Sequence, residues 1–420
     1  MENERGDIRS QSIKYKKLQT LMYHINKETL IKEHRKQTSN KASGIDKMTK
    51  EKYEENLYNN IEELIQSMKL FKYRPQAVRR TYIPKVNGKL RPLGIPAYED
   101  KLVQGVMANI LNDIYEPRFL NCSYGFRANR NCHNAIASIK KTIMTKPVNY
   151  ILDADIKGFF DNVDHEWLIK FIENDIEDKN FIRYIVRFLK SGIMEKEVIK
   201  ESLKGTPQGG PISPVLANVY LHYVLDLWVE KWVKPRAKGY VEIVRYADDF
   251  IVMFQYENEA KSFYEILKKR LLKFNLELEE NKTRIIPFGR LKGSKESFDF
   301  LGFTHINAKT RKGKYIVKHK TSKKKMKVKR KEFKMWMKEN MHKPVYEIME
   351  TIKRKLIGHY NYYGINNNSK SICDYYIYVK WNTYRILNRR HQKKSMSYEI
   401  FNRIWNGFLM PIPHIKVNIG

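Results

Sequence analysis

The stretch from Val241 to Phe254 reads Val-Glu-Ile-Val-Arg-Tyr-Ala-Asp-Asp-Phe-Ile-Val-Met-Phe, and it decides the fold. Two apolar runs rich in β-branched residues flank a short polar centre, which is typical of a β-hairpin. Asp248 and Asp249 fall at the predicted turn. Adjacent carboxylates repel each other, and a Mg²⁺ ion, which prefers oxygen ligands, would relieve that repulsion. A solvated Asp-Asp turn is the competing interpretation, and a third carboxylate nearby would favour the metal site.

A third acidic residue follows another strand-like run. Residues 149–155 read Asn-Tyr-Ile-Leu-Asp-Ala-Asp, and aromatic residues come soon after Asp155. If this run and the hairpin are neighbouring strands of one sheet, Asp155 meets Asp248 and Asp249. Three convergent carboxylates suit two metal ions about 3.5 to 4 Å apart, the arrangement that polymerases use for in-line phosphoryl displacement.

Composition favours a globular protein with a polyanionic partner. The 420 residues are 42% hydrophobic and carry 80 Lys and Arg against 46 Asp and Glu, a net charge of +34. This length allows two or three domains, and the charge excess makes nucleic acid the first candidate partner. An anionic membrane is the competing partner, but no apolar run reaches about 18 residues. We therefore expect a soluble intracellular protein with no membrane partner.

The three cysteines do not indicate a metal or disulfide framework. Cys122, Cys132 and Cys373 include no Cys-x-x-Cys pair, so a zinc knuckle is not expected. We interpret them as small buried residues in a reducing compartment.

Patterning divides the N-terminal part into helices, a loop and a hairpin. Residues 1 to about 75 show apolar positions at helical spacing, interrupted by the polar segment 37–47, which is either a connector or a basic flap over a bound backbone. An Asn-Gly pair then marks a hairpin turn flanked by Lys85 and Arg91. These two cations are either a clamp for a triphosphate or ordinary surface charges.

Two further loops carry candidate binding residues. Residues 123–130 combine a turn with aromatic and basic side chains, and Arg127 and Arg130 either contact template phosphates or pair with nearby acids. Residues 204–214 hold three glycines and three prolines around Gln208. Because glycine lets a backbone approach its neighbours closely, we predict that this second loop contacts a substrate.

Basic residues are concentrated towards the C-terminus. Residues 311–420 hold 27 Lys and Arg against 6 Asp and Glu, which leaves a net charge of +21. A near-continuous basic run at 320–334 precedes a segment at 356–364 in which aromatic residues alternate with amides. A charge run is usually a solvated face, but basic and aromatic residues on one helical module suit backbone contacts and stacking on unpaired bases. We therefore favour a module that binds RNA or a hybrid duplex.

Taken together, these motifs appear in the order found in reverse transcriptases. They are Asp155 with the following Phe-Phe-Asp, Gly-Thr-Pro-Gln-Gly-Gly-Pro-Ile-Ser-Pro at 205–214, Tyr-Ala-Asp-Asp at 246–249, Glu-Asn-Lys-Thr at 280–283 and Phe-Leu-Gly-Phe at 300–303. The chain resembles bacterial group II intron-encoded reverse transcriptase/maturases in particular. That closer likeness rests on Gly-Ile-Asp at 44–46, Ile-Pro-Lys at 83–85, Ser-Tyr-Gly-Phe-Arg at 123–127 and Gly-His-Tyr-Asn-Tyr-Tyr-Gly at 358–364.

The resemblance implies an α+β fold of the right-hand polymerase kind. It would have fingers, a palm built on an antiparallel sheet, and an all-helical thumb. Residues 1–75 would form an N-terminal extension and the start of the fingers, and residues 76–308 the reverse transcriptase fingers and palm. Residues 309–420 would form the basic helical thumb or maturase (X) domain.

The resemblance also implies roles for individual residues. Asp155, Asp248 and Asp249 would hold two Mg²⁺ ions. Ile156 would lie beside them and contribute to the metal site and to the site of the deoxynucleotide (dNTP). Lys282 would assist pyrophosphate departure as a general acid. Phe160 matches a bulky gate that excludes a ribose 2′ hydroxyl. The remaining predicted contacts are Lys85, Arg91 and Gln208 for the dNTP, and Arg127, Arg130, Phe300, Leu301, Gly302, Lys323, Lys324, Lys325, Tyr360 and Tyr362 for nucleic acid.

The resulting hypothesis is an RNA-directed DNA polymerase that copies an RNA template from a DNA primer and assists splicing and mobility of a host group II intron. A reverse transcriptase detached from any intron and used in host defence or repair is the alternative with the same fold. A noncatalytic RNA-binding splicing maturase is the alternative of another class. We also expect no C-terminal zinc-bearing endonuclease, a cytoplasmic location with nucleoid association during mobilisation, and a homodimer as one allowed assembly.

Overall fold

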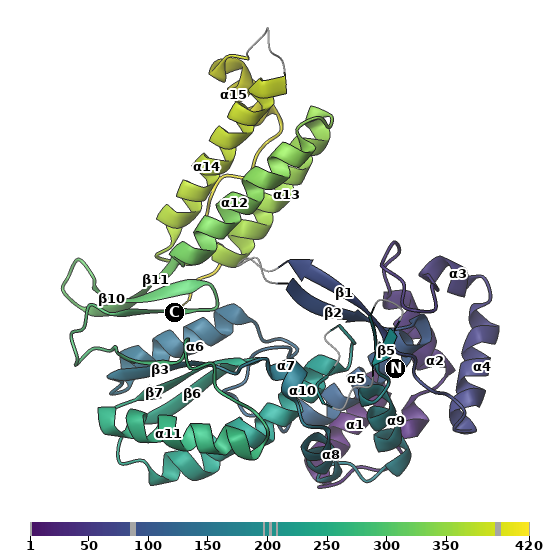
Figure 1. The fold of residues 1–420 in the computed structure, drawn as a ribbon. Coiled ribbons are helices and arrows are strands. Elements are labelled where there is room, and N and C mark those ends of the chain that lie inside the picture. The colour runs from purple at the N-terminus through teal and green to yellow at the C-terminus, as the bar shows by residue number, and fades with distance from the viewer. Residues whose placement is uncertain are drawn as a thin grey trace. The chain divides into compact units, whose positions relative to one another are not determined.

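The computed structural model describes residues 2–84, 90–195, 198–200, 204–206, 209–390 and 396–419. The chain folds into two compact units, each described here by itself (Figure 1). The first unit comprises Met1–Asn131, Leu152–Val252 and Asn258–Arg284, and the second comprises Cys132–Ile151, Met253–Glu257 and Ile285–Gly420. The predicted division at residues 75 and 308 stays a prediction.

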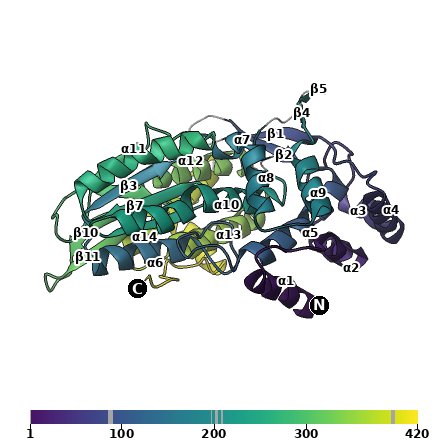
Figure 2. The ribbon, with the colours of Figure 1, turned by 90° about the horizontal axis from the view of Figure 1, so that it is seen from below.

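The N-terminal part of the first unit is helical, as predicted. Its elements are α1 (Glu2–Lys14), η1 (Leu21–His24), α2 (Lys27–Lys36), α3 (Lys50–Glu54) and α4 (Leu57–Lys69). Helices α1 and α2 pack against α5 (Tyr98–Tyr115), most of whose apolar side chains are buried (Figure 2). The polar segment at 37–47 is a loop, and Oδ2 of Asp46 accepts a hydrogen bond from the backbone N–H of Tyr98 at 2.6 Å. This loop is therefore tied to the start of α5.

A small sheet in the same unit has the order β2-β1-β4-β5. Strands β1 (Val78–Pro84) and β2 (Leu90–Ile95) pair antiparallel, which confirms the predicted hairpin, although its Asn-Gly turn lies outside the described residues. Strand β4 (Ile193–Glu195) runs parallel to β1 and pairs antiparallel with β5 (Val198–Lys200).

The central sheet has the order β6-β7-β3-β8. Strands β6 (Val241–Tyr246) and β7 (Asp249–Phe254) form the predicted hairpin, and β3 (Tyr150–Asp155) lies beside β7, with β8 (Arg284–Pro287) on its other side. The interior positions of β7 are all buried, which explains its continuous apolar sequence. The expected neighbour relation between the two acidic strands is therefore confirmed.

The first unit contains further helices. They are α7 (Phe159–Asn162), α8 (His165–Glu173), α9 (Lys179–Leu189), α10 (Ser213–Leu221) and α11 (Glu257–Lys273). Helix α10 continues into two π-helical stretches, η2 (His222–Asp226) and η3 (Val229–Val233), before the short 3₁₀ turn η4 (Lys234–Arg236).

The second unit combines a three-stranded antiparallel sheet with a helical module. Strands β9 (Ser297–Phe300), β10 (Phe303–Lys309) and β11 (Tyr315–Thr321) have the order β11-β10-β9, and α6 (Cys132–Thr145) packs against β11. The module consists of α12 (Lys323–Asn340), α13 (Val345–Tyr363), α14 (Ser369–Leu387), η5 (Asn388–Arg390) and α15 (Tyr398–Gly407), around one apolar core. The α+β class is confirmed, and the helices begin at Lys323 rather than at residue 309 because residues 315–321 pair with β10.

Two smaller expectations have different outcomes. Within the described ranges, no helix has the length and apolar character needed to cross a bilayer. Of the cysteines, Cys132 is buried and Cys122 is half-buried, but Cys373 is exposed on α14, so the expectation of burial was wrong for Cys373.

Candidate active site

The three predicted aspartates lie on neighbouring strands of the central sheet. Asp155 is the last residue of β3, Asp248 lies in the turn after β6, and Asp249 is the first residue of β7. Strands β3 and β7 are hydrogen-bonded neighbours, and the charge of Asp155 acts on Asp249. The fold therefore brings together residues that are more than ninety positions apart in the sequence.

Crowding of negative charge perturbs Asp249. Partial burial, followed by the charges of Asp248, Asp155 and Asp153, raises the pKa of Asp249 to about 7, while Lys282 acts in the opposite direction. The side chain of Asp249 is nevertheless exposed to solvent, so water weakens the effect of burial on its pKa. The upward direction of the pKa shift therefore rests mainly on repulsion from the neighbouring carboxylates. A bound cation would relieve the repulsion.

Lys282 is held against Asp155. Its Nζ donates a hydrogen bond to Oδ2 of Asp155, and this hydrogen bond raises the pKa of Lys282. Backbone hydrogen bonds explain the placement, because Glu279 N donates to Asp155 O at 2.8 Å and Lys157 N donates to Glu277 O at 2.9 Å. The segment before Lys282 therefore runs along the end of β3, and Lys282 remains protonated beside the aspartates.

The donor set fits divalent cations, although the side chains do not form a ready-made site. Carboxylate oxygens are the ligands that Mg²⁺ prefers, and their mutual repulsion favours a cation. Across the described residues, however, no three Asp, Glu, His or Cys side chains form a group able to hold an ion. The ammonium of Lys282 engages one oxygen of Asp155, so an ion would compete with it there. The predicted Ile156 is 2% exposed, and it forms an isolated bridge with Leu278.

A buried arginine holds the turn that carries Asp248. Arg245 is 0% exposed, and its Nε and Nη2 donate to Asp226 at 2.7 and 2.5 Å. Its Nη1 donates to Oδ1 of Asn218 and to the carbonyl of Ala247, both at 3.0 Å. Ala247 itself has a φ of 57°, in the left-handed region that alanine seldom adopts. The buried network therefore stabilises a strained residue directly before the aspartates.

Sequence analysis did not identify Arg245 or Asp226 as site residues. A charged residue inside an apolar strand was the available signal for Arg245, because such a residue must be paired when it is buried. No comparable signal marks Asp226, since it ends the π-helical stretch η2, where the side-chain register departs from that of an α-helix.

Phe160, the predicted gate, lies in α7, and the glycine-rich loop holds the backbone of this helix. Thr206 N donates to Phe160 O at 2.8 Å, and Gly205 N donates to Val163 O at 2.8 Å. Gly205 has a φ of 87°, and a Cβ at this position would lie 3.0 Å from the carbonyl oxygens of Phe160 and Asp161. A glycine is therefore needed where the loop meets the gate helix.

The other predicted dNTP contacts are not described at the side-chain level. Lys85 and Gln208 lie outside the described residues. The backbone of Arg91 lies in β2 opposite Ile83, but its side chain lies outside the described part of the structure.

The two arginines of the 123–130 loop have different surroundings. Arg127 is 6% exposed, and its guanidinium donates to the carboxylate of Glu116 at 3.0 and 2.8 Å and to the carbonyl of Leu120 at 2.7 Å. Of its two interpretations, this geometry supports pairing with an acid. Arg130 is half-buried, donates to Asn121, and stays a predicted phosphate contact.

Three of the predicted nucleic-acid contacts, Phe300, Leu301 and Gly302, form a bend in the second unit. Phe300 ends β9 and is 4% exposed, and Leu301 and Gly302 follow with φ values of 48° and 79°. The hydroxyl of Tyr362 donates to the carbonyl of Leu301 at 2.9 Å, which ties α13 to this bend. Phe303 then opens β10, so the Phe-Leu-Gly-Phe segment joins two strands through a tight bend.

The remaining predicted nucleic-acid contacts differ in exposure. Lys323, Lys324 and Lys325 are exposed in the first turn of α12. Tyr360, in contrast, is 0% exposed and belongs to the apolar core of the helical module. In this structure the three lysines are accessible to a partner, whereas Tyr360 serves packing.

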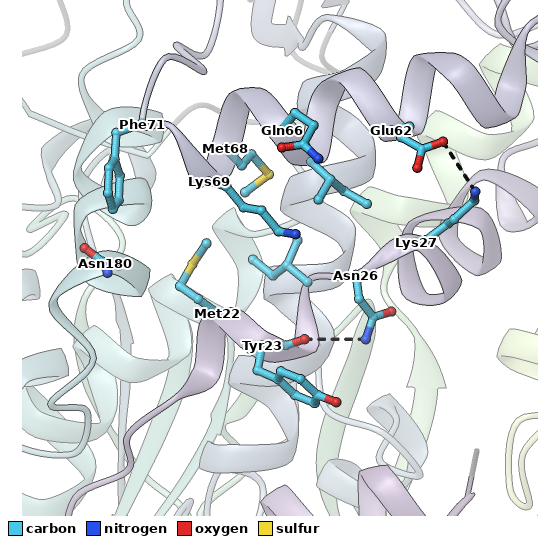
Figure 3. Close-up of a pocket in the computed structure, with 12 residues that line it drawn as sticks. Met22, Tyr23, Asn26, Lys27, Glu62, Gln66, Met68, Lys69, Phe71 and Asn180 are labelled. Carbon is cyan, nitrogen blue, oxygen red and sulfur yellow. Dashed lines mark hydrogen bonds and ion pairs between the residues drawn. The ribbon is translucent and has the colours of Figure 1, made fainter.

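A separate cavity of about 570 Å³ lies among the N-terminal helices of the first unit (Figure 3). Residues of η1, α4 and the start of α9 line it, and Nζ of Lys27 pairs with Glu62 at 3.6 Å beside it. None of the predicted site residues is among those that line it. It is therefore distinct from the aspartate site.

Comparison with known proteins agrees with this geometry. The family described as reverse transcriptase (RNA-dependent DNA polymerase) matches residues 83–305, slightly more than half of the chain. Group II intron-encoded protein LtrA of Lactococcus lactis is 36% identical over 260 residues, which cover 57% of this chain and 43% of LtrA. Protein YkfC of Escherichia coli is 31% identical over 57% of this chain and 70% of YkfC, and an uncharacterised 91 kDa protein in the cob intron of Schizosaccharomyces pombe is 40% identical over 40% and 21%.

The match to LtrA covers less than half of that relative's length. The matched residues 83–305 include all three aspartates, Lys282 and the gate Phe160. The chain therefore belongs to the reverse transcriptase family.

Proposed function

We propose that this protein is an RNA-directed DNA polymerase that extends a DNA primer on an RNA template by metal-assisted nucleotidyl transfer. The single observation that carries the proposal is the placement of Asp155, Asp248 and Asp249 on adjacent strands, with protonated Lys282 beside them. A plain structural role would not need carboxylates that repel one another. Acidic residues whose pKa values are shifted by their neighbours are instead typical of functional sites.

The aspartates are the residues that would hold divalent ions, and we propose two Mg²⁺. Such ions, when bound, supply Lewis acidity and neutralise charge on phosphoryl oxygens. Arg245 keeps the turn of Asp248 fixed, so that the carboxylates need little reorganisation. Lys282, whose pKa is raised by Asp155, is positioned to donate a proton to a leaving pyrophosphate. Phe160, together with Lys85, Arg91 and Gln208, would select and bind the dNTP.

Primer extension tests this proposal. Wild-type protein, the double variant Asp248→Ala/Asp249→Ala and the control Asp374→Ala would be supplied with an RNA template, a DNA primer, dNTPs and Mg²⁺. Asp374 is an exposed acid on α14 in the second unit. We expect extension by the wild type and the control, and loss of at least about a thousandfold in the double variant. RNA binding without extension by any of the three would contradict the proposal and support the noncatalytic maturase.

A second part of the proposal is that the helical module binds structured RNA, with group II intron RNA as the native partner. Three exposed lysines occupy the first turn of α12, where the helix dipole disfavours cations. A polyanion bound at this turn would relieve that unfavourable placement. The names of LtrA and of the S. pombe protein associate these relatives with introns, which supports an intron as the RNA.

Competition binding separates the intron from other RNA. The protein would be titrated with a group II intron RNA and with a structured RNA of equal length from another source, at matched salt. We expect tighter binding to the intron. Phosphate contacts alone do not distinguish the two RNAs, so a difference in affinity would come from contacts that only the intron can make. Equal affinities, with polymerase activity intact, would instead favour the alternative of a reverse transcriptase detached from any intron.

A further inference from the structure

We propose that Phe126 is a specificity-determining residue that positions the gate Phe160, and so controls the discrimination between deoxyribonucleotides and ribonucleotides. This inference rests on the proposed function, since it concerns the nucleotide pocket of the same site. The two rings lie edge to face, with centroids 6.4 Å apart and planes at 83°. That is a favoured geometry for an aromatic pair.

The conformation of Phe126 is not one that a phenylalanine adopts freely. Its φ is 57°, in the left-handed region, and its side chain is 52% exposed. Bulky residues seldom occupy this region, and when they do the observation points to a functional constraint. Burial stabilises this half-exposed side chain less than it would a core phenylalanine, so burial alone does not explain a phenylalanine in a strained backbone.

The residues on either side of Phe126 are fixed by the protein. The carbonyl of Gly125 accepts a hydrogen bond from Nδ2 of Asn218 at 2.8 Å, and a Cβ at Gly125 would lie 2.5 Å from the backbone nitrogen of Ala247. Arg127 is anchored by its ion pair with Glu116. Phe126 therefore forms the tip of a rigid loop that packs directly against the turn of the catalytic aspartates.

The gate ring has a second aromatic neighbour. Phe159, which is 2% exposed, lies edge to face with Phe160, with centroids 5.4 Å apart and planes at 66°. The backbone of Phe160 is fixed by Thr206 N. Among the described residues, the Phe160 ring is thus contacted by the buried ring of Phe159 and by the half-exposed ring of Phe126. Loss of the Phe126 ring would remove one of these contacts and give the gate ring more freedom to rotate away from a ribose 2′ hydroxyl.

Single-nucleotide incorporation measures the effect. The ratio of kcat/KM for a dNTP to that for the matching ribonucleotide would be determined for wild type, Phe126→Ala, Phe126→Tyr and Phe160→Ala. An edge-to-face pair contributes enough to predict a fall of the ratio by about 2- to 10-fold in Phe126→Ala. Phe126→Tyr keeps the ring and should keep the ratio, and Phe160→Ala should lower the ratio further than Phe126→Ala.

Two further variants separate positioning from other roles. In the Phe160→Ala background, Phe126→Ala should change the ratio no further, because it acts through the gate. Phe126→Gly removes the ring but suits the positive φ, so it should lower the ratio even if Phe126→Ala is poorly soluble. Tyr58→Ala, at an aromatic residue of α4 that is 58% exposed, is the matched control and should leave the ratio unchanged.

The inference is overturned if Phe126→Ala and Phe126→Gly reduce incorporation of both nucleotide classes equally. That result would assign the ring to a template base instead. It is also overturned if the effects of Phe126→Ala and Phe160→Ala are additive. A wild type that extends no primer with dNTPs would refute the proposed function itself, whereas active wild type with an unchanged ratio in the Phe126 variants refutes this inference alone.

Discussion

Asp226→Asn should destabilise the sheet that carries the turn of Asp248 and Asp249, although Asp226 is not expected to touch a substrate. The substitution keeps the shape of the side chain and removes its charge. Arg245 would then remain charged, since a guanidinium does not lose its proton in proteins. Its side chain and that of Asp226 are both 0% exposed, so water cannot replace the lost carboxylate.

The contacts of Asp226 determine how much stability the substitution should remove. Asp226 accepts two charge-assisted hydrogen bonds from Arg245, at 2.7 and 2.5 Å. Removal of one partner from a buried ion pair costs about 3 to 5 kcal/mol. An asparagine oxygen can still accept one of the two bonds, so we expect the lower end, about 3 kcal/mol. That is a large part of the 5 to 15 kcal/mol that is typical of a whole domain.

Hydrogen exchange followed by mass spectrometry is the suitable assay, because a chain with two units is unlikely to unfold in a single step. Amide protection in β6 and β7 reports the local opening free energy. A loss of about 3 kcal/mol corresponds to a fall in protection of roughly 100-fold. Glu277→Gln is the matched control, since its pair with Lys157, at 3.2 Å, has both side chains 61% exposed and should contribute at most about 1 kcal/mol.

Two results would refute this reasoning. The first is a change in protection no larger for Asp226→Asn than for Glu277→Gln. The second is a large change that appears throughout the first unit but spares β6 and β7, because the loss would then not arise at the turn held by Arg245.

The remaining predictions concern pH and salt. The raised pKa of Asp249 means that the folded state holds this proton more tightly than the unfolded chain, so metal-free stability should fall as the pH rises from about 4 towards about 7. Asp249→Asn should raise the melting temperature near neutral pH and flatten that decline, and an unchanged decline would count against the carboxylate cluster. Burial lowers the pKa of His359, which is 1% exposed, to about 3. Stability from this group is therefore complete above about pH 6.5 and is lost progressively as the pH falls towards about 3, so His359→Phe should move acid unfolding to lower pH; an identical acid midpoint would contradict this. Replacing Lys323, Lys324 and Lys325 by Gln should reduce the slope of log affinity for single-stranded RNA against log salt by about 2, and equal slopes would exclude phosphate contacts at α12.

The sequence predicted those features of the fold that depend on local pattern. The apolar runs around Asp248 and Asp249 indicated one hairpin, and the Asn-Gly pair before Arg91 indicated another, because turn chemistry is local. The position of β3 next to β7 came from the family resemblance, since pairing between distant strands leaves no local signal. The structure confirms that pairing.

Other features could not be predicted because they depend on tertiary contacts. Tyr360 and Tyr362 are two positions apart on α13, which places them on different sides of a helix, so that Tyr360 is buried while Tyr362 meets the bend at Leu301. Strand β11 was hidden in the basic C-terminal segment, since its two lysines alternate with the buried residues Val317, His319 and Thr321. The partner of Arg245 was hidden by the π-helical register of η2.

Binding of divalent ions by the three aspartates is the central claim, and it can be measured directly by electron paramagnetic resonance with Mn²⁺ in place of Mg²⁺. The protein would be bound to a primer–template and a non-hydrolysable dNTP. We predict two ions per complex for wild type and for the control Asp374→Ala, and at most the one ion carried by the triphosphate for Asp248→Ala/Asp249→Ala. The same number of bound ions in wild type and in the double variant would contradict the account.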